Sequence, residues 1–219
     1  MFHSSVQLSK AATTISVGQL RRRIARAVAQ EKELLIDPEF FQVLPGRLVG
    51  ISAVDVQLKR GKAPNELTRY RYDVVLHTRE PVGSRAVCEP LEWQTAAGAA
   101  AELEVGLRER RWCAARLHSV PNSRLAREVA AQRLIETSDE RLTAGALRRQ
   151  LNELQFDEVD PQQFLEWGQA HGYDTQVSWD AQESPRCFEV RFIDRAQADR
   201  VPRAIWRSEE RRVGKECRS

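Results

Sequence analysis

Two stretches of alternating apolar and polar residues, Ile51–Arg60 and Thr68–Thr78, predict a pair of strands in the first third of the chain. Polar residues fill one face of each strand, which is typical of a strand with one side in water. Gly61 and Pro64 mark the loop between them. Because this loop is too short for a helical crossover, we expect the two strands to pair antiparallel.

A helical period runs over Val17–Ile36, where apolar residues recur on one face. Arginines occupy much of the remaining surface of this expected helix: Arg21, Arg22, Arg23 and Arg26. Such a run is typical of a solvated face, and contact with phosphate is the alternative that the sequence leaves open. Asp37 and Pro38 then predict a short helix, since Asp is a good N-cap and Pro suits the first helical position.

The second half of the chain has the pattern of a small α+β region. It begins after a turn-rich connector at roughly Glu80–Pro90. The expected order is helix 95–110, strand 112–121, helices 123–136, 143–154 and 161–172, and strands 173–179 and 187–194. Two units follow from this pattern, 1–80 and 91–206. Because an isolated hairpin is marginal in water, we expect the first strand pair to lie at the edge of a larger sheet that the chain does not contain.

Composition narrows the class of protein. The chain has 219 residues, 42% of them hydrophobic and 30% charged, as in an ordinary soluble protein. It shows neither a signal-peptide core nor an apolar run of membrane-spanning length, so we expect a cytoplasmic protein without a membrane partner. The net charge is +3, and residues 207–219 alone carry five basic and three acidic side chains. This tail resembles a translated adapter or cloning scar, and the nearly neutral remainder does not indicate a nucleic-acid partner.

Motifs of several common site classes are absent from the sequence. Neither a GxGxxG nor a Walker A loop is present, so nucleotide binding is not indicated. The histidines and cysteines lie far apart and have no metal-ligand spacing: His3, His77, His118, His171, Cys88, Cys113, Cys187 and Cys217. We therefore expect no metal site and interpret the cysteines as buried thiols.

The segment NELTRYRYDVV, from Asn65 to Val75, closely resembles the second conserved motif of the methyltransferase domains embedded in nonribosomal peptide synthetases. DPEFFQVLPGRL, VDVQLKRG and the opening FHSSVQL are also similar to this family. TQVSWDAQ, residues 175–182, resembles a degraded third motif: Ser178 and Gln182 match it, whereas Asp180 and Ala181 depart from it. The resemblance extends from Phe2 to about Trp206.

The resemblance implies a partial α/β fold. Residues 1–80 would supply the last strands of a class I Rossmann-like methyltransferase sheet, and 91–206 a small α+β subdomain. The cofactor would be S-adenosylmethionine, whose glycine-rich binding loop is missing from this sequence, so no cofactor-binding residue is assigned. The chain is therefore expected to be the C-terminal half of the domain, truncated at its start and inactive alone.

The family's substrate is an aminoacyl group held as a thioester on a phosphopantetheine carrier, in secondary metabolite biosynthesis. Partners would be the adenylation and peptidyl-carrier domains of the same megasynthase. N-methylation is the common outcome, and methylation at carbon or oxygen stays open, as does the identity of the amino acid.

The motif supplies the candidate site residues. A carboxylate beside the reacting nitrogen can orient the amine or take its proton, which makes Glu66 the candidate catalytic residue, with Asn65 beside it to hold a carbonyl. Tyr70, Arg71 and Tyr72 are candidates for substrate binding. The structural alternative is that the tyrosines are ordinary sheet-face residues and that Arg71 forms a surface ion pair with Glu66 or Asp73.

A different class of function is also compatible with the pattern. If Met1 is a true start, the chain would be a standalone, non-catalytic α+β module that binds a partner through its arginine-rich first helix. Nucleic-acid contact through that helix would show steep salt dependence.

Overall fold

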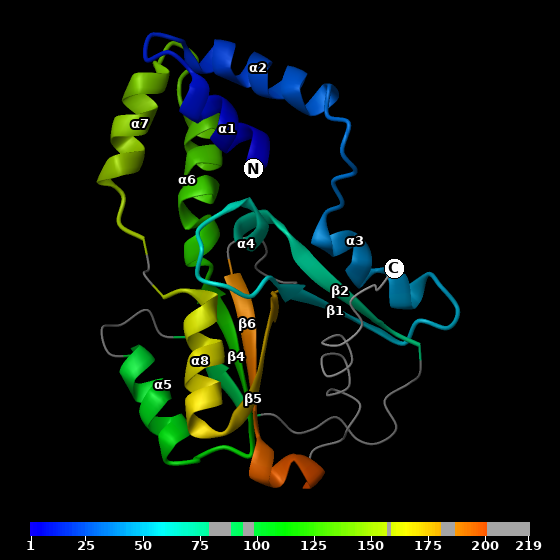
Figure 1. Cartoon of the computed structure of the whole chain (residues 1–219). Helices are drawn as coiled ribbons and strands as arrows, with labels where there is room; N and C mark the ends of the chain where they lie inside the picture. Colours follow the sequence, from blue (N-terminus) through cyan, green and yellow to red (C-terminus); the bar gives the residue numbers. More distant parts are fainter. Residues whose placement is uncertain (79–88, 94–98, 157–158, 181–186, 201–219) are drawn as a thin grey trace, which may run out of the picture.

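The computed structural model describes residues 1–78, 89–93, 99–156, 159–180 and 187–200. A six-stranded sheet occupies one part of the molecule, and a group of helices forms the end that lies uppermost in Figure 1. The helices are α1 (Phe2–Lys10), α2 (Val17–Ala29), α3 (Pro38–Gln42), α4 (Glu66–Tyr70), α5 (Ala99–Arg108), α6 (Ser123–Thr137), α7 (Ala144–Glu153) and α8 (Pro161–His171), with 3₁₀ turns η1 (Leu44–Gly46) and η2 (Arg195–Arg200). The strands are β1 (Ala53–Leu58), β2 (Tyr72–His77), β3 (Glu89–Glu92), β4 (Ala114–Pro121), β5 (Tyr173–Trp179) and β6 (Cys187–Asp194).

The strand order is β2-β1-β5-β6-β4-β3. Neighbouring strands are antiparallel except for β3 and β4, which pair parallel. The expected β1–β2 hairpin is confirmed, and β1 pairs on its other side with β5, where Gln57 lies opposite Ser178. The prediction that the neighbours of this hairpin lie outside the chain is thus wrong on the β1 side. The fold is mixed α/β, and the Rossmann-like methyltransferase sheet stays a prediction.

One face of the sheet packs against α5 and α8 to form the larger hydrophobic core. Residues of both helices and alternating side chains of β4, β5 and β6 fill it: Leu103, Leu107, Ala115, Leu117, Val120, Phe164, Tyr173, Val177, Phe188, Val190 and Phe192. Helix α8 lies close on β5 because residue 168 is glycine. A Cβ atom there would lie 1.7 Å from Thr175 Oγ1.

Charged side chains occupy the opposite face of the sheet. Asp55 Oδ2 lies 3.0 Å from His77 Nε2, and Asp55 Oδ1 lies 3.7 Å from Arg191 Nη1. Arg191 also donates to Glu189 at 2.8 Å, and Glu189 accepts a second bond from Arg116 Nε at 3.0 Å. Asp55 and Glu189 thus each contact an arginine, and these contacts together with the Asp55–His77 hydrogen bond link β2, β1, β6 and β4.

A second core joins α1 and α2 to α6 and α7. Its buried residues are Leu8, Ala11, Val17, Leu20, Ala131, Ile135, Ala144, Leu147 and Leu151, so it draws on both sides of the boundary expected between 80 and 91. Arg21 donates to the carbonyls of Ile135 and Ser138 at 2.8 and 2.7 Å and thereby caps the end of α6. One of the four arginines of the expected helix is therefore used inside the fold.

The boundaries of two elements differ from the predictions. The helix predicted over Val17–Ile36 ends at Ala29. The Glu31 carboxylate then accepts the backbone N–H groups of Lys32 and Glu33, at 2.8 and 2.9 Å, which favours a turn over further helix. Strand β3 lies partly within Glu80–Pro90, the stretch that the sequence pattern predicted as a connector. The pattern gave no local signal for this strand, because β3 is held by its long-range pairing with β4.

The structure also bears on membrane-spanning helices, metal-ligand clusters and the burial of the cysteines. Within the described residues, no helix combines the length and the apolar character needed to cross a membrane. The same residues contain no cluster of three metal-ligating side chains. Cys113 is exposed and Cys187 half-buried, so the prediction of buried thiols is wrong for Cys113, while Cys88 and Cys217 lie outside the described residues.

Candidate functional site

The NEL segment folds as a capped helical turn. Asn65 Oδ1 accepts the Thr68 N–H at 3.1 Å, and Thr68 Oγ1 accepts the Asn65 N–H at 3.3 Å. This reciprocal capping box starts α4, so the strand predicted from Thr68 begins only at Tyr72. The Asn65 side chain therefore serves as a helix cap, a role that the motif did not indicate.

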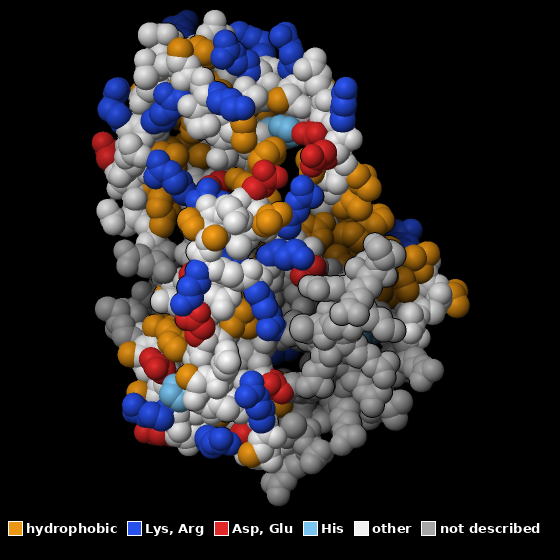
Figure 2. Space-filling view, in the orientation of Figure 1, with side chains coloured by type: hydrophobic (Ala, Val, Ile, Leu, Met, Phe, Trp, Pro, Cys, Tyr) orange, Lys and Arg blue, Asp and Glu red, His pale blue; other side chains and the backbone are white. Residues whose placement is uncertain are grey.

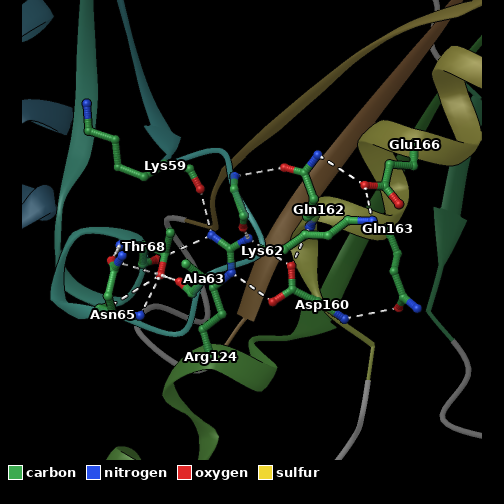
Figure 3. Close-up of polar contacts among 11 residues, drawn as sticks. Lys59, Lys62, Ala63, Asn65, Thr68, Arg124, Asp160, Gln162, Gln163 and Glu166 are labelled. Atoms are coloured by element: carbon green, nitrogen blue, oxygen red, sulfur yellow. Dashed lines mark hydrogen bonds and ion pairs between the residues drawn. The ribbon is translucent and has the colours of Figure 1, made fainter.

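Arg124, at the start of α6, clamps this turn from beneath (Figure 3). Its side chain is only 7% exposed. It donates to the carbonyl oxygens of Lys59 at 2.6 Å and Gly61 at 2.7 Å. It also holds the Asp160 carboxylate by two bonds of 2.9 and 2.8 Å. Because its donors are fixed in a planar fork, one guanidinium links the β1–α4 loop to the start of α8.

The loop is also fixed by contacts with α8. Gly61 has φ +126°, a conformation that favours glycine, and its N–H donates to Gln162 Oε1 at 2.9 Å. Lys62 Nζ lies 2.8 Å from Glu166 Oε1, and this bond from Lys62 lowers the pKa of the Glu166 carboxyl. The sequence identified the Asp160 helix start, but it had no signal for Arg124 or Gln162 as partners of the loop.

Glu66 and Arg71 are the two predicted site residues that the fold brings together. Glu66 Oε1 lies 3.8 Å from Arg71 Nη2, and the Glu66 side chain is 56% exposed. Arg71 is also 3.5 Å from Glu33 Oε2, whereas Asp73 pairs with Lys59. The carboxylate of Glu66 therefore remains accessible at the surface of α4.

The two predicted tyrosines contact other elements. Tyr70 packs edge-on against Phe2 of α1, with ring centroids 5.2 Å apart. Tyr72 lies against Phe41 and Trp179, and its hydroxyl donates to the backbone carbonyl of residue 36. The structure thus gives both tyrosines packing contacts, Tyr70 with α1 and Tyr72 with α3 and β5.

The tyrosines give a prediction for alkaline pH. The chain has three of them, Tyr70, Tyr72 and Tyr173, and burial raises the pKa of each above its usual value. The unfolded chain loses these protons near pH 10, while the folded chain keeps them, so stability falls as pH rises above about 10. Ultraviolet titration should show phenolate forming together with unfolding. Native protein that ionises at the pH of the urea-unfolded control would contradict this.

The segment resembling the third motif forms much of β5. Ser178 is buried, and its Oγ has no hydrogen-bond partner in the described part of the chain. Asp180 accepts the N–H of Ser119 at 3.2 Å, where β4 is irregular and Ser119 has φ 56°. This gives Asp180 a structural role. Ala181 and Gln182 lie outside the described residues.

A cavity of about 740 Å³ lies between α1, the β1–α4 loop, α6, α7 and the start of α8. Its wall includes five cationic side chains: Lys62, Arg69, Arg124, Arg127 and Arg148. Glu128 and Asp160 are the carboxylates of the wall. From the NELTRYRYDVV segment, Thr68 and Arg69 line this space, and the five predicted site residues do not. We call it the cationic cavity.

The cationic cavity does not suit S-adenosylmethionine. Its family loop, a glycine-rich turn after a strand, is absent from the sequence. The cationic cavity is an unfavourable place for a sulfonium, because like charges repel in a partly buried site. No residue of this chain is therefore assigned to the methyl donor.

Curated proteins with similar sequences include nonribosomal peptide synthetases, and no protein-family model matches the chain. Chondramide synthase cmdD of Chondromyces crocatus is 49% identical over 75 residues, 34% of this chain and 2% of that protein. The probable non-canonical nonribosomal peptide synthetase CymA of Salinispora arenicola is 41% identical over 120 residues, 55% of this chain and 1% of that protein. Nonribosomal peptide synthetase asqK of Emericella nidulans is 42% identical over 83 residues, 36% of this chain and 3% of that protein. The chain thus spans only a few per cent of the length of these relatives.

Proposed function

We propose that this chain belongs to a methyltransferase region of a nonribosomal peptide synthetase, and that this region acts on an aminoacyl thioester held by a phosphopantetheine carrier. Two findings support the proposal: the resemblance of Asn65–Val75 to the family motif, and the similarity to synthetases at 41–49% identity over partial stretches. Adenylation and peptidyl-carrier domains are the proposed partners. The amine is the proposed acceptor and S-adenosylmethionine the proposed methyl donor, to which no residue of this chain is assigned.

The geometry that carries the proposal is the clamped turn. Arg124 and the Asn65 cap hold α4 in place, and the Glu66 carboxylate remains exposed on it. An amine attacks only when it is neutral, and its proton must leave, so a fixed and accessible carboxylate suits the role of proton acceptor. We assign Glu66 to that role. Arg71, whose Nη2 lies 3.8 Å from Glu66 Oε1, would help to orient the carboxylate.

Asn65 takes a positioning role in this proposal, because its side chain caps the helix that carries Glu66. Tyr70 and Tyr72 would support the site through packing, Tyr70 against α1 and Tyr72 against the sheet. Substrate contact by either tyrosine stays a prediction. The same holds for the division of the chain at 80 and 91, and for the scar-like segment 207–219.

The coding sequence around this chain provides a first test. A continuous reading frame should include a glycine-rich strand-loop-helix before the residues corresponding to Met1 and a carrier domain after those corresponding to Trp206. A stop and a start codon that isolate the 219 residues as one gene would contradict the proposal.

The alternative of a binding module that uses α2 receives no specific support. Arg21 is engaged with α6, while Arg22, Arg23 and Arg26 are exposed, as expected for a solvated face. Contact between this helix and a partner stays a prediction.

A further inference from the structure

We propose that the cationic cavity is a binding site for the phosphate group of a phosphate ester. The inference rests on the charges and the shape of the cavity, and it does not depend on methyl transfer. Figure 2 shows Lys and Arg side chains over the helical end of the molecule, where several of these elements meet.

The cavity has more positive charge than its own carboxylates neutralise. Asp160 is held by Arg124 through two bonds, and Glu128 lies 3.2 Å from Arg69. These pairs account for both carboxylates of the wall. The remaining positive charge belongs to Lys62, Arg127 and Arg148, and of these Lys62 is paired with Glu166.

Arg127 and Arg148 are the cations that lack an acidic partner among the described residues. Arg127 Nη2 donates to the neutral amide oxygen of Asn152 at 2.6 Å. Arg148 donates to backbone carbonyls at the end of α1, including that of Ser9 at 3.2 Å. Neutral acceptors orient a guanidinium and leave its charge uncompensated. A phosphate in the cavity would supply the missing negative charge and accept the planar fork of donors.

The start of α6 forms part of the same wall. Ser123 and Arg124 open this fifteen-residue helix, and both line the cavity. The preceding Asn122 makes no side-chain cap, so its side chain does not occupy the N–H groups of the first turn. The positive end of the helix dipole therefore favours an anion at the place where the side-chain cations already gather.

The size and the remaining lining indicate an ester and not an inorganic ion alone. A volume of about 740 Å³ is typical of sites for small organic ligands. Leu8, Ala131 and Leu151 supply an apolar wall beside the charged one. A ligand with a phosphate at one end and a largely uncharged organic arm matches this division. Free phosphate esters and a phosphopantetheine arm share this chemistry.

Calorimetric titration of the 219-residue chain tests the site with three probes: inorganic phosphate, 4′-phosphopantetheine and pantetheine. We expect both phosphate-bearing probes to bind and pantetheine to bind at least tenfold more weakly. Arg127→Gln should raise the Kd for phosphopantetheine about tenfold or more, because an ionic hydrogen bond is lost. Arg133→Gln is the matched control, since Arg133 lies on the same helix, is exposed and does not line the cavity.

Tighter binding of phosphopantetheine than of phosphate would show that the cavity also recognises the pantetheine arm. Equal binding of the two probes would show that it recognises only the phosphate group. The proposal is overturned if neither phosphate-bearing probe binds, or if folded Arg127→Gln binds like wild type. Circular dichroism of both variants reports whether they are folded. A negative result leaves the methyl-transfer proposal standing, because that proposal rests on Glu66 and its motif.

Discussion

Replacing Arg124 with methionine is expected to lower the free energy of unfolding by about 2–4 kcal/mol. The guanidinium is buried and satisfies the carbonyls of Lys59 and Gly61 as well as the Asp160 carboxylate. Methionine fills part of the volume and makes none of these bonds. The Asp160 side chain is 36% exposed, so water solvates its carboxylate once the guanidinium is removed. The loss in the free energy of unfolding is therefore smaller than for a fully buried ion pair.

Urea denaturation monitored by tryptophan fluorescence measures this loss. Arg133→Met, on the exposed face of α6, is the matched control and should change stability by no more than about 0.5 kcal/mol. Arg124→Lys should not restore stability, because an ammonium cannot span two carbonyls and both carboxylate oxygens. Equal midpoints for the Arg124→Met and Arg133→Met variants would show that the loop does not depend on the clamp.

Replacing Glu66 with glutamine is expected to slow single-turnover methylation about 100-fold in the synthetase to which we assign this chain. Glutamine keeps the size of the side chain and its ability to accept a hydrogen bond, but it cannot take a proton from the amine. Affinity for S-adenosylmethionine should not change, since no residue of this chain is assigned to the cofactor. Rapid quench of a preloaded carrier, followed by analysis of the product, gives the rate.

Glu33 provides the control for that experiment. Its carboxylate lies 3.5 Å from Arg71, as Glu66 lies 3.8 Å from the same guanidinium, and it is similarly exposed. Glu33→Gln should therefore leave the rate near that of wild type. Equal rates for wild type and both variants would remove Glu66 from the mechanism, and equal slowing by both would indicate that the charge of Arg71 matters instead.

Local signals explain which elements were predictable. Helix α8 begins at Pro161 after its Asp160 cap and ends where Gly172 adopts φ 80°, as the sequence indicates. Strands β5 and β6 have the predicted bounds, because alternation and turn residues are properties of neighbouring positions. Element types in the second half of the chain were predicted for the same reason.

The arrangement of strands was not predictable in the same way. Alternation in Ile51–Arg60 predicts one wet face, but it does not say that β5, more than 100 residues later, would lie beside β1. The stretch Thr68–Tyr70 also alternates, yet the Asn65 capping box makes it helical. A side-chain cap in a short loop thus overrode the local strand pattern.

The long-range contacts of the candidate site residues were also not predictable from the sequence. The motif indicated Glu66 and Arg71, and the fold places them together. It gave no sign that the Tyr70 ring would pack on α1, or that Arg124 would hold the loop, since the bonds from Arg124 to Lys59 and Asp160 span 65 and 36 residues. Only the three-dimensional contacts separate the residues that support the turn from the carboxylate exposed on it.

The most direct test of the central claim is the mass of a carrier-bound aminoacyl thioester after one turnover with S-adenosylmethionine. The synthetase region that includes this chain should add one methyl group to the amine, and omission of the cofactor should abolish the addition. An aminoacyl group that is loaded on the carrier, stays unmodified and is released unchanged would contradict the assignment to methyl transfer.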